Sequence, residues 1–125
     1  MEEDKMANKI NWDEMEWEQV APSIKRKMIW GEHTMVARLE LKKDCLVPQH
    51  QHHNEQISTI HSGTIRFWLG EDKSEIVDVH AGESLIIPPN VPHEALMIED
   101  VVGTDTFSPP RQDWIEGDDA YLRES

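Results

Sequence analysis

The sequence has a single cysteine, Cys45, in 125 residues, and it has no apolar run long enough to cross a membrane. One thiol cannot form an internal disulfide, and a membrane helix requires about 18 or more continuous apolar residues. The first thirty residues also lack the apolar stretch that is typical of a signal peptide. We therefore expect a cytoplasmic protein with no membrane partner, in which Cys45 is a small half-buried hydrophobic residue rather than a nucleophile.

Basic residues are scarce: the chain has 12 Lys and Arg against 25 Asp and Glu, which gives a formal net charge of -13. Binding to nucleic acid requires a basic face for the phosphates, and no basic stretch is present. We therefore expect no nucleic-acid partner. The acidic residues gather near the two ends of the chain, where they are typical of solvated surface that keeps a protein in solution.

Long amphipathic helix patterns are also missing, and short strand patterns take their place. In residues 34–41 apolar side chains alternate with largely polar ones, which is typical of a half-buried strand. The same period of two appears in residues 63–70, and short apolar runs bounded by turn residues follow as far as Phe107. This spacing predicts an all-β sandwich or barrel.

The N-terminal residues differ from the rest of the chain. Residues 1–11 are polar and have no pattern, and the stretch WDEMEWEQV at 12–20 favours a short helical turn that Pro22 then ends. We therefore divide the chain into an acidic N-terminal arm, irregular or helical, over residues 1–20 and a single β domain over residues 21–125.

The stretch HQHHNEQ at residues 50–56 is the densest group of potential metal ligands in the chain. In an extended strand His50 and His52 point to the same face and can hold one metal ion as a pair. Gln56 shares that face if the strand continues, whereas a bend in between would bring Glu55 there instead. We favour Gln56.

A further ligand has to come from elsewhere in the sequence, and His93 is well presented because it follows the rigid PPNVP corner. Imidazole suits many divalent ions, and the amide oxygen of Gln56 is a weak neutral ligand. Such a set carries no negative charge, so the ion would keep its full charge for an anionic substrate. We expect one divalent metal ion, with Zn, Ni, Mn and Fe all open.

The spacing of these residues resembles the first of the two motifs of the cupin superfamily, in which Gly, His-x-His, Glu and Gly follow at set intervals. His50, His52 and Gly63 fit the count, and Gln56 stands in the position of the Glu. Asp44 replaces the opening Gly. The count to Gly63 supports Gln56 over its neighbour as the ligand.

The second cupin motif is matched by Gly82, Pro88 and His93. Asn90 stands at its inner Gly and Met97 at its final Asn. Asn tolerates left-handed backbone better than most residues, so Asn90 can replace that Gly. The resemblance covers the whole predicted barrel, and it implies a cupin jelly roll with a metal site inside its mouth.

Within the cupins, Gln56 and the phrase DTFSPPR at 105–111 resemble the KdgF group of small cupins from pectin and alginate breakdown. In that group Asp, Phe and Arg spaced as D-x-F-x-x-x-R lie beside a His-His-Gln-His metal site, and Asp105, Phe107 and Arg111 match them. The resemblance implies a metal-dependent lyase or isomerase that opens 4,5-unsaturated monouronates to linear keto-uronates. The partner would be a small anionic sugar.

Each of these three residues then has an expected role. Asp105 is the candidate acid/base, Arg111 offers a planar fork for the substrate carboxylate, and Phe107 would pack on the sugar ring. Other interpretations are available for each. Asp105 would then hydrogen-bond a turn, Phe107 would belong to the core, and Arg111 would pair with a nearby acid such as Asp113.

Two other functions stay open: a small metal-dependent cupin dioxygenase and a non-catalytic module that binds a sugar acid. The first is disfavoured, because such sites commonly keep the Glu that Gln56 replaces. The resemblance also implies a homodimer. Exposed tryptophans at Trp12, Trp17 or Trp30 would support such a contact, although core packing would explain them equally well.

Overall fold

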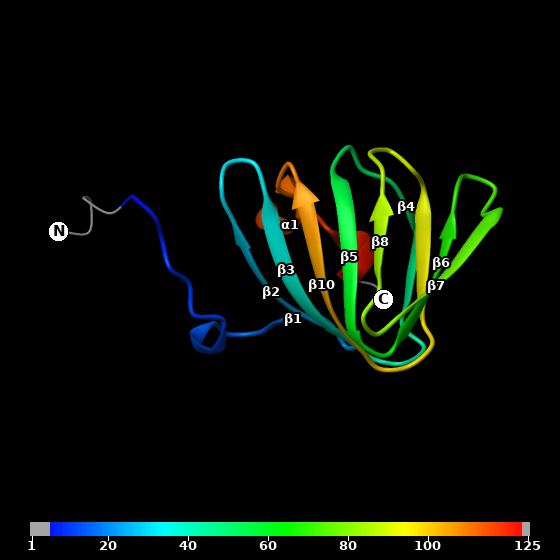
Figure 1. Cartoon of the computed structure of the whole chain (residues 1–125), viewed down its shortest axis with the longest axis horizontal. Coiled ribbons are helices and arrows are strands. Elements are labelled where there is room, and N and C mark those ends of the chain that lie inside the picture. The colour runs from blue at the N-terminus through cyan, green and yellow to red at the C-terminus, as the bar shows by residue number, and fades with distance from the viewer. Residues whose placement is uncertain (1–5, 124–125) are drawn as a thin grey trace.

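The computed structural model describes residues 6–123, which form two antiparallel β-sheets and two short helices (Figure 1). The strands, in chain order, are β1 (Glu18–Ala21), β2 (Ile24–Trp30), β3 (Met35–Leu41), β4 (Leu46–His50), β5 (Glu55–Ser62), β6 (Thr64–Leu69), β7 (Glu75–His80), β8 (Ser84–Ile87), β9 (His93–Met97) and β10 (Val101–Ser108). The helices that follow are α1 (Gln112–Glu116) and α2 (Ala120–Arg123).

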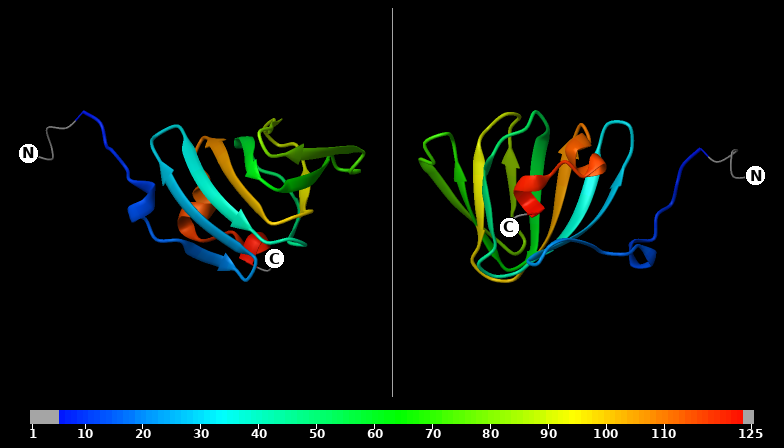
Figure 2. Two further views of the ribbon diagram at one scale, coloured as in Figure 1. Left: turned by 60° about the horizontal axis from the view of Figure 1, so that its bottom comes forward. Right: turned by 180° about the vertical axis from the view of Figure 1, so that it is seen from behind.

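One sheet has six strands in the order β1-β2-β3-β10-β5-β8, and the other has four in the order β4-β9-β6-β7. Consecutive strands such as β4 and β5, or β9 and β10, therefore lie in different sheets. Figure 2 shows the two sheets converging along one edge of the molecule, with α1 and α2 crossing the space between them. The predicted all-β jelly-roll fold is confirmed.

The strand faces alternate as the sequence predicts. Every odd-numbered side chain of β3 is buried, and so are Ile65, Phe67 and Leu69 of β6. These side chains form the core between the two sheets. Cys45 is also buried, with 4% of its surface exposed, which is more than the half-burial expected for it. Burial raises the pKa of the Cys45 thiol, which disfavours the thiolate that a nucleophile needs.

The N-terminal segment is less helical than predicted. Only Trp12–Glu14 form a 3-10 turn, while Glu18–Ala21 form a strand at the edge of the six-stranded sheet. The helical turn predicted over 12–20 is therefore wrong in its second half. The reason is non-local: this stretch pairs with β2, and the Glu18 carboxylate lies 2.9 Å from Nε of Arg26 on that strand.

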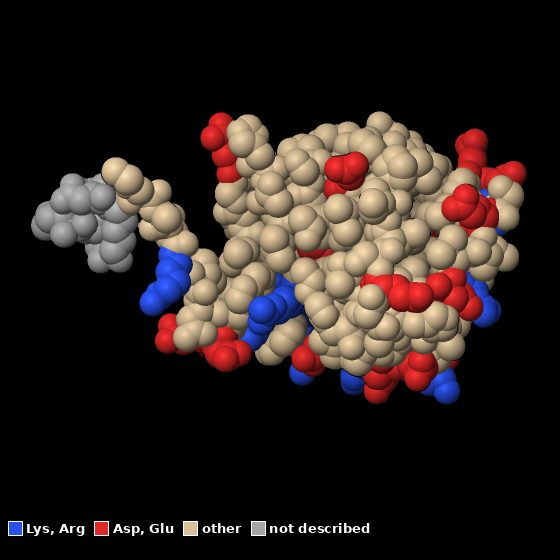
Figure 3. All heavy atoms as spheres, viewed as in Figure 1, with Lys and Arg blue, Asp and Glu red and all other residues tan. Residues whose placement is uncertain are grey.

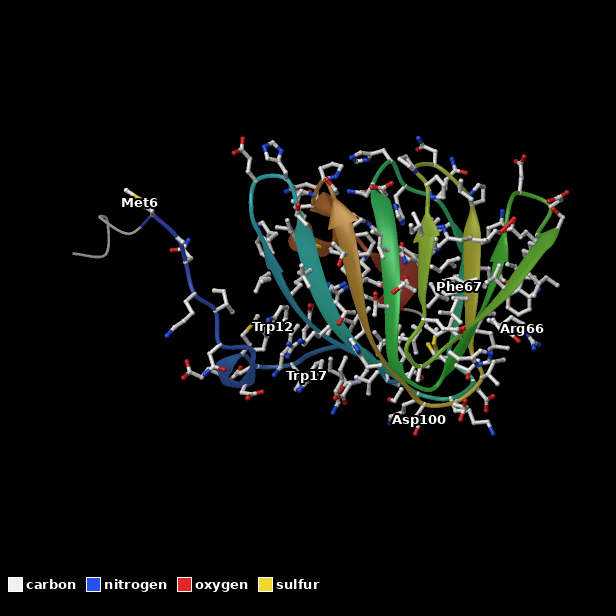
Figure 4. All side chains as sticks on the ribbon, viewed as in Figure 1. Met6, Trp12, Trp17, Arg66, Phe67 and Asp100 are labelled. Atoms are coloured by element: carbon white, nitrogen blue, oxygen red, sulfur yellow. The ribbon has the colours of Figure 1, made fainter. Side chains whose placement is uncertain are left out.

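The outer surface carries most of the charged side chains and some of the aromatic ones. Acidic residues are mixed with a few basic ones on the face displayed in Figure 3. Figure 4 shows Met6 far out on the N-terminal segment, and Trp12 and Trp17 nearer the sheet. Trp17 and Trp30 are 38% and 49% exposed, so they lie outside the core. Among the described residues, no helix has the length and apolar character that a membrane span requires.

Four turn residues with a positive φ lie at the glycine positions of the two cupin motifs; two of them are glycine and two are other residues. Gly63 and Gly82 both have a φ of 87°, and Asn90 has a φ of 65°, as its tolerance for left-handed backbone predicts. Asp44 has a φ of 71°, so it adopts the backbone of the glycine that it replaces. Gly63 carries a second constraint, because a Cβ atom there would overlap the carbonyl oxygen of Asp100.

We predict that Gly63→Ala lowers the free energy of unfolding by more than about 3 kcal/mol, because it combines left-handed backbone with steric overlap. Gly82→Ala has the same φ but open space around the new Cβ atom. It should cost only about 1–2 kcal/mol. Gly31→Ala, with neither constraint, is the control. Urea denaturation measures all three variants, and equal losses at Gly63 and Gly82 would contradict a role for the overlap.

Candidate metal centre

Three histidines from two strands and a loop meet inside the barrel. His50 ends β4 and His93 begins β9, and the antiparallel register sets these two residues opposite each other. His52 follows on the loop that leads to β5. One ring nitrogen from each histidine lies within 4.8 Å of the other two. The structure thus brings together the three histidines that the sequence analysis selected.

Each imidazole is held by a hydrogen bond to a backbone carbonyl. In each case Nδ1 lies 2.8–3.0 Å from the oxygen of a residue two positions away in the sequence: Pro48 for His50, Asn54 for His52 and Val91 for His93. A carbonyl oxygen only accepts, so Nδ1 carries the hydrogen and Nε2 keeps its lone pair, as in metal-binding histidines. Among the described residues, Nε2 of His93 is buried and has no hydrogen-bond partner.

Gln56 joins the histidines from β5. Its Oε1 atom lies 3.2 Å from Nε2 of His52, and its amide nitrogen donates to the hydroxyl of Ser58 at 2.9 Å. Ser58 in turn donates to Oδ1 of Asp105 at 2.7 Å. This chain of donors turns the amide oxygen of Gln56 toward His52. A lone pair of Oε1 of Gln56 then faces the lone pair of Nε2 of His52. Such a contact becomes favourable when a cation lies between them.

The donor set fits a divalent metal ion. Three imidazole nitrogens and one amide oxygen suit most first-row divalent ions and carry no formal charge. Gln56 is only 6% exposed, whereas the neighbouring side chains of Glu55 and His53 are exposed. The structure therefore brings Gln56, and not Glu55, to the histidines.

The surroundings keep the imidazoles neutral. Burial is the main cause that lowers the pKa of His50 to about 3 and the pKa of His52 to about 4. The neighbouring histidines and the positive charge of Arg111 lower both pKa values further. Burial also lowers the pKa of His93. Since the neutral imidazole is the form that binds metal, these side chains are ready to bind across the physiological pH range.

Asp105 lies next to this group on β10. The register between β5 and β10 sets it opposite Ser58, which explains the hydrogen bond between them. Burial raises the pKa of Asp105 to about 6, while the Ser58 hydrogen bond and the positive charge of Arg111 oppose this shift. A carboxyl group with such a pKa can accept and give up a proton near neutral pH.

Phe107 and Arg111 lie side by side in the barrel interior, 1% and 2% exposed. The guanidinium carbon of Arg111 is 5.1 Å from the centre of the Phe107 ring. Nε and Nη2 of Arg111 donate to the two carboxylate oxygens of Asp113 at 2.9 and 2.7 Å, and Nη2 also donates to the hydroxyl of Tyr121 at 2.6 Å. A core position for Phe107 and an ion pair for Arg111 are thus both present in this structure.

The sequence matches a known family and a known relative. Residues 37–101 match the cupin domain family. The chain belongs to the cupin family. Over 106 residues it is 28% identical to the pectin degradation protein KdgF of Dickeya dadantii, a match that covers 82% of this cupin and 94% of the relative.

Two solved structures are similar along most of the chain. KdgF from Halomonas sp. is 27% identical with a TM-score of 0.75, and the match covers 83% of this cupin and 96% of that chain. An RmlC-like cupin from Shewanella frigidimarina is 26% identical with a TM-score of 0.76, over 84% of this cupin and 93% of that chain. The predicted resemblance to KdgF-type cupins is confirmed.

Three residues of this site, Asn54, Ser58 and Tyr121, were not selected from the sequence. Asn54 is 2% exposed, and its amide nitrogen donates to the carbonyl oxygens of Pro109 and Pro110 at 2.6 and 3.2 Å. It therefore ties the loop after the histidine pair to the proline turn. Tyr121 lies with its ring centre 4.4 Å from that of His50. The position of Asn54 between two ligands was a usable signal, whereas Tyr121 lies outside both motifs.

We predict that the affinity for Ni²⁺ falls less than about tenfold between pH 7.5 and pH 5.5. Three histidines with ordinary pKa values near 6.5 would each lose about tenfold, and about a thousandfold together, because protons compete for the ring nitrogens. The lowered pKa values move this competition to lower pH. Competition titration with a chelator measures the affinity at each pH.

Two variants complete this test. His93→Ala should remove tight binding, because it deletes one of the three grouped nitrogens. His61→Ala is the control, since His61 bonds Thr104 through its ring nitrogen on the exposed side of the barrel. A loss near a thousandfold in the unsubstituted protein would contradict the neutral state assigned to the histidines.

Proposed function

We propose that this cupin catalyses the metal-dependent ring opening of 4,5-unsaturated monouronates to linear keto-uronates in the breakdown of pectin or alginate. The observation that carries the proposal is the carboxyl group of Asp105, which has a raised pKa and is joined through Ser58 to Gln56 at the candidate metal centre. The similarity to the pectin degradation protein KdgF supports the substrate class.

The reaction moves one proton from oxygen to carbon. A base takes the proton of the hydroxyl group on carbon 1, the bond between carbon 1 and the ring oxygen breaks, and an aldehyde and an enolate form. An acid then delivers the proton to carbon 4, which leaves the ketone at carbon 5. Asp105 can serve both steps, since a carboxyl group with a pKa of about 6 accepts and returns a proton near neutral pH.

The other residues would bind and orient the sugar. Arg111 offers a planar fork for a bidentate pair with the substrate carboxylate. Phe107, beside it, offers an apolar surface for the sugar ring. The three histidines and Gln56 would hold the metal ion, which when bound supplies positive charge to stabilise negative charge that develops on substrate oxygens.

We also propose that the strands form one domain, which begins with β1 at Glu18 rather than at residue 21, and that the protein is a cytoplasmic homodimer. Trp17 and Trp30 are the exposed aromatic side chains that would support a contact between two copies. Light scattering of the purified protein should give twice the mass of the 14.5 kDa chain. A monomer mass at micromolar concentration would contradict the dimer.

The ring-opening reaction has a direct assay. Metal-loaded protein, added to freshly generated unsaturated galacturonate, should speed the loss of ultraviolet absorbance from the conjugated enol. No acceleration over buffer would contradict the proposal. Tight uronate binding without turnover would point instead to a sugar-acid-binding module, and oxygen uptake would point to a dioxygenase.

Asp105→Asn should lower kcat by about 10² to 10⁴-fold while leaving the metal content unchanged. Thr106→Ala, the next residue on β10 with its side chain on the opposite face, is the matched control. In the unsubstituted enzyme kcat/KM should rise with pH as Asp105 loses its proton. The midpoint of this rise should lie at about pH 6, or lower when the metal ion is bound, because a nearby cation lowers the pKa of a carboxyl group. Full activity in Asp105→Asn would remove Asp105 from the acid/base role.

A further inference from the structure

The cavity at the candidate metal centre is too small for a sugar. Its volume is about 70 Å³, whereas pockets that bind small molecules measure roughly 300–1,000 Å³. Its lining includes His50, Asp105 and Arg111, together with Trp114 and Tyr121 from the segment that follows β10. A monouronate can therefore enter only if part of this lining moves.

Apart from Arg111, the lining residues that belong to neither sheet come from the C-terminal segment Gln112–Arg123. Figure 2 shows its helices α1 and α2 crossing the space between the two sheets. Trp114 of α1 is 5% exposed, and its ring packs edge-on against Phe107 with the ring centres 5.0 Å apart. The segment therefore fills space next to the residues that would bind the sugar.

Asp113 of α1 holds Arg111 in the way that a substrate carboxylate would. Nε and Nη2 of Arg111 donate to its two oxygens, which is the fork geometry of bidentate carboxylate recognition. We propose that α1 is a lid latched by this pair, and that Asp113 gives up Arg111 only when the carboxylate of a ligand takes its place. This inference rests on the role of Arg111 in the proposed function.

Burial of the guanidinium makes the exchange selective for acids. Arg111 is 2% exposed, so removing Asp113 without a replacement would leave a buried charge without its counter-ion, which is costly. Asp113 is 36% exposed, so its carboxylate can turn into water when it is released. A uronate restores the charge balance, whereas a neutral hexose does not and cannot offset the cost of opening.

The two ends of the segment are held differently, which identifies the part that moves. Asp119 is fully buried, and its two oxygens lie 2.6 Å from Arg26 on β2 and 2.6 Å from Arg123. This network anchors α2 to the six-stranded sheet. Gly117, with a φ of 77°, forms the turn between the two helices. We take α1 as the lid and Gly117 as its hinge. Opening then breaks the hydrogen bond from Nε1 of Trp114 to the hydroxyl of Tyr121, while the ion pairs of Asp119 keep α2 in place.

Calorimetry of the metal-loaded full chain tests the latch with two stable probes: D-galacturonate, which lacks the double bond that the reaction needs, and D-galactose, its neutral counterpart. The unsubstituted protein should bind galacturonate and not galactose. Asp113→Asn, which removes the internal competitor, should bind galacturonate at least about tenfold more tightly. Glu116→Gln removes the same charge from the same helix, where Glu116 contacts Gln112 and not Arg111, and should change the affinity less than about twofold.

Unchanged or weaker galacturonate binding in Asp113→Asn would overturn the proposal, and so would equal binding of galactose by the unsubstituted protein. Hydrogen exchange of the unsubstituted protein provides a second test, which does not require Asp113→Asn to fold. Saturating galacturonate should speed exchange of the α1 amides in the unsubstituted protein and leave α2 unchanged, whereas slower or unchanged exchange in α1 would contradict a lid. These readouts measure binding, so the lid can stand if ring opening fails, and ring opening can stand if the lid fails.

Discussion

The antiparallel register between β5 and β10 is the constraint on which the site depends. It sets Gln56 opposite Phe107 and Ser58 opposite Asp105, so that these four side chains share the inner face of one sheet. A shift of either strand by one residue would turn its two side chains of this set to the outside, because side chains alternate along a strand. Backbone hydrogen bonds between the two strands therefore position the metal ligand, the acid/base candidate and the hydroxyl group between them. Their side-chain contacts are not needed for this placement.

Within this register, an amide at residue 56 has a consequence that a carboxylate would not have. The Gln56 amide donates to Ser58, which frees the hydroxyl hydrogen of Ser58 for Asp105. A glutamate could only accept, so Ser58 would have to choose between two carboxylates, and the repulsion between them would raise the pKa of one. Gln56 thus leaves Asp105 as the one acid of this hydrogen-bonded chain, and it leaves the metal ligands without negative charge.

Local patterns predicted the parts of the molecule that depend on alternation and spacing. They were sufficient for β3, β6 and the grouping of His50, His52 and His93, because two-residue periodicity fixes the face of each side chain. They failed for β2, where the buried Arg26 interrupts the apolar face, and for Glu18–Ala21, whose strand depends on pairing with β2. Contacts between residues far apart in the chain decide such segments, and one sequence does not display them.

The C-terminal segment is the extreme case, because its helices of five and four residues are too short to be stable alone. Cation–π contacts help to hold α1: the ring centre of Trp114 is 4.7 Å from the guanidinium carbon of Arg26 on β2 and 4.9 Å from that of Arg111. Each such contact is worth about 0.5–2 kcal/mol, whereas buried ion pairs add little net stability because desolvation offsets them. The pair of Arg26 and Asp119 therefore acts chiefly by fixing the position of α2, since a buried charge tolerates only the arrangement that pairs it. That arrangement sets α2 against the sheet and Tyr121 against His50.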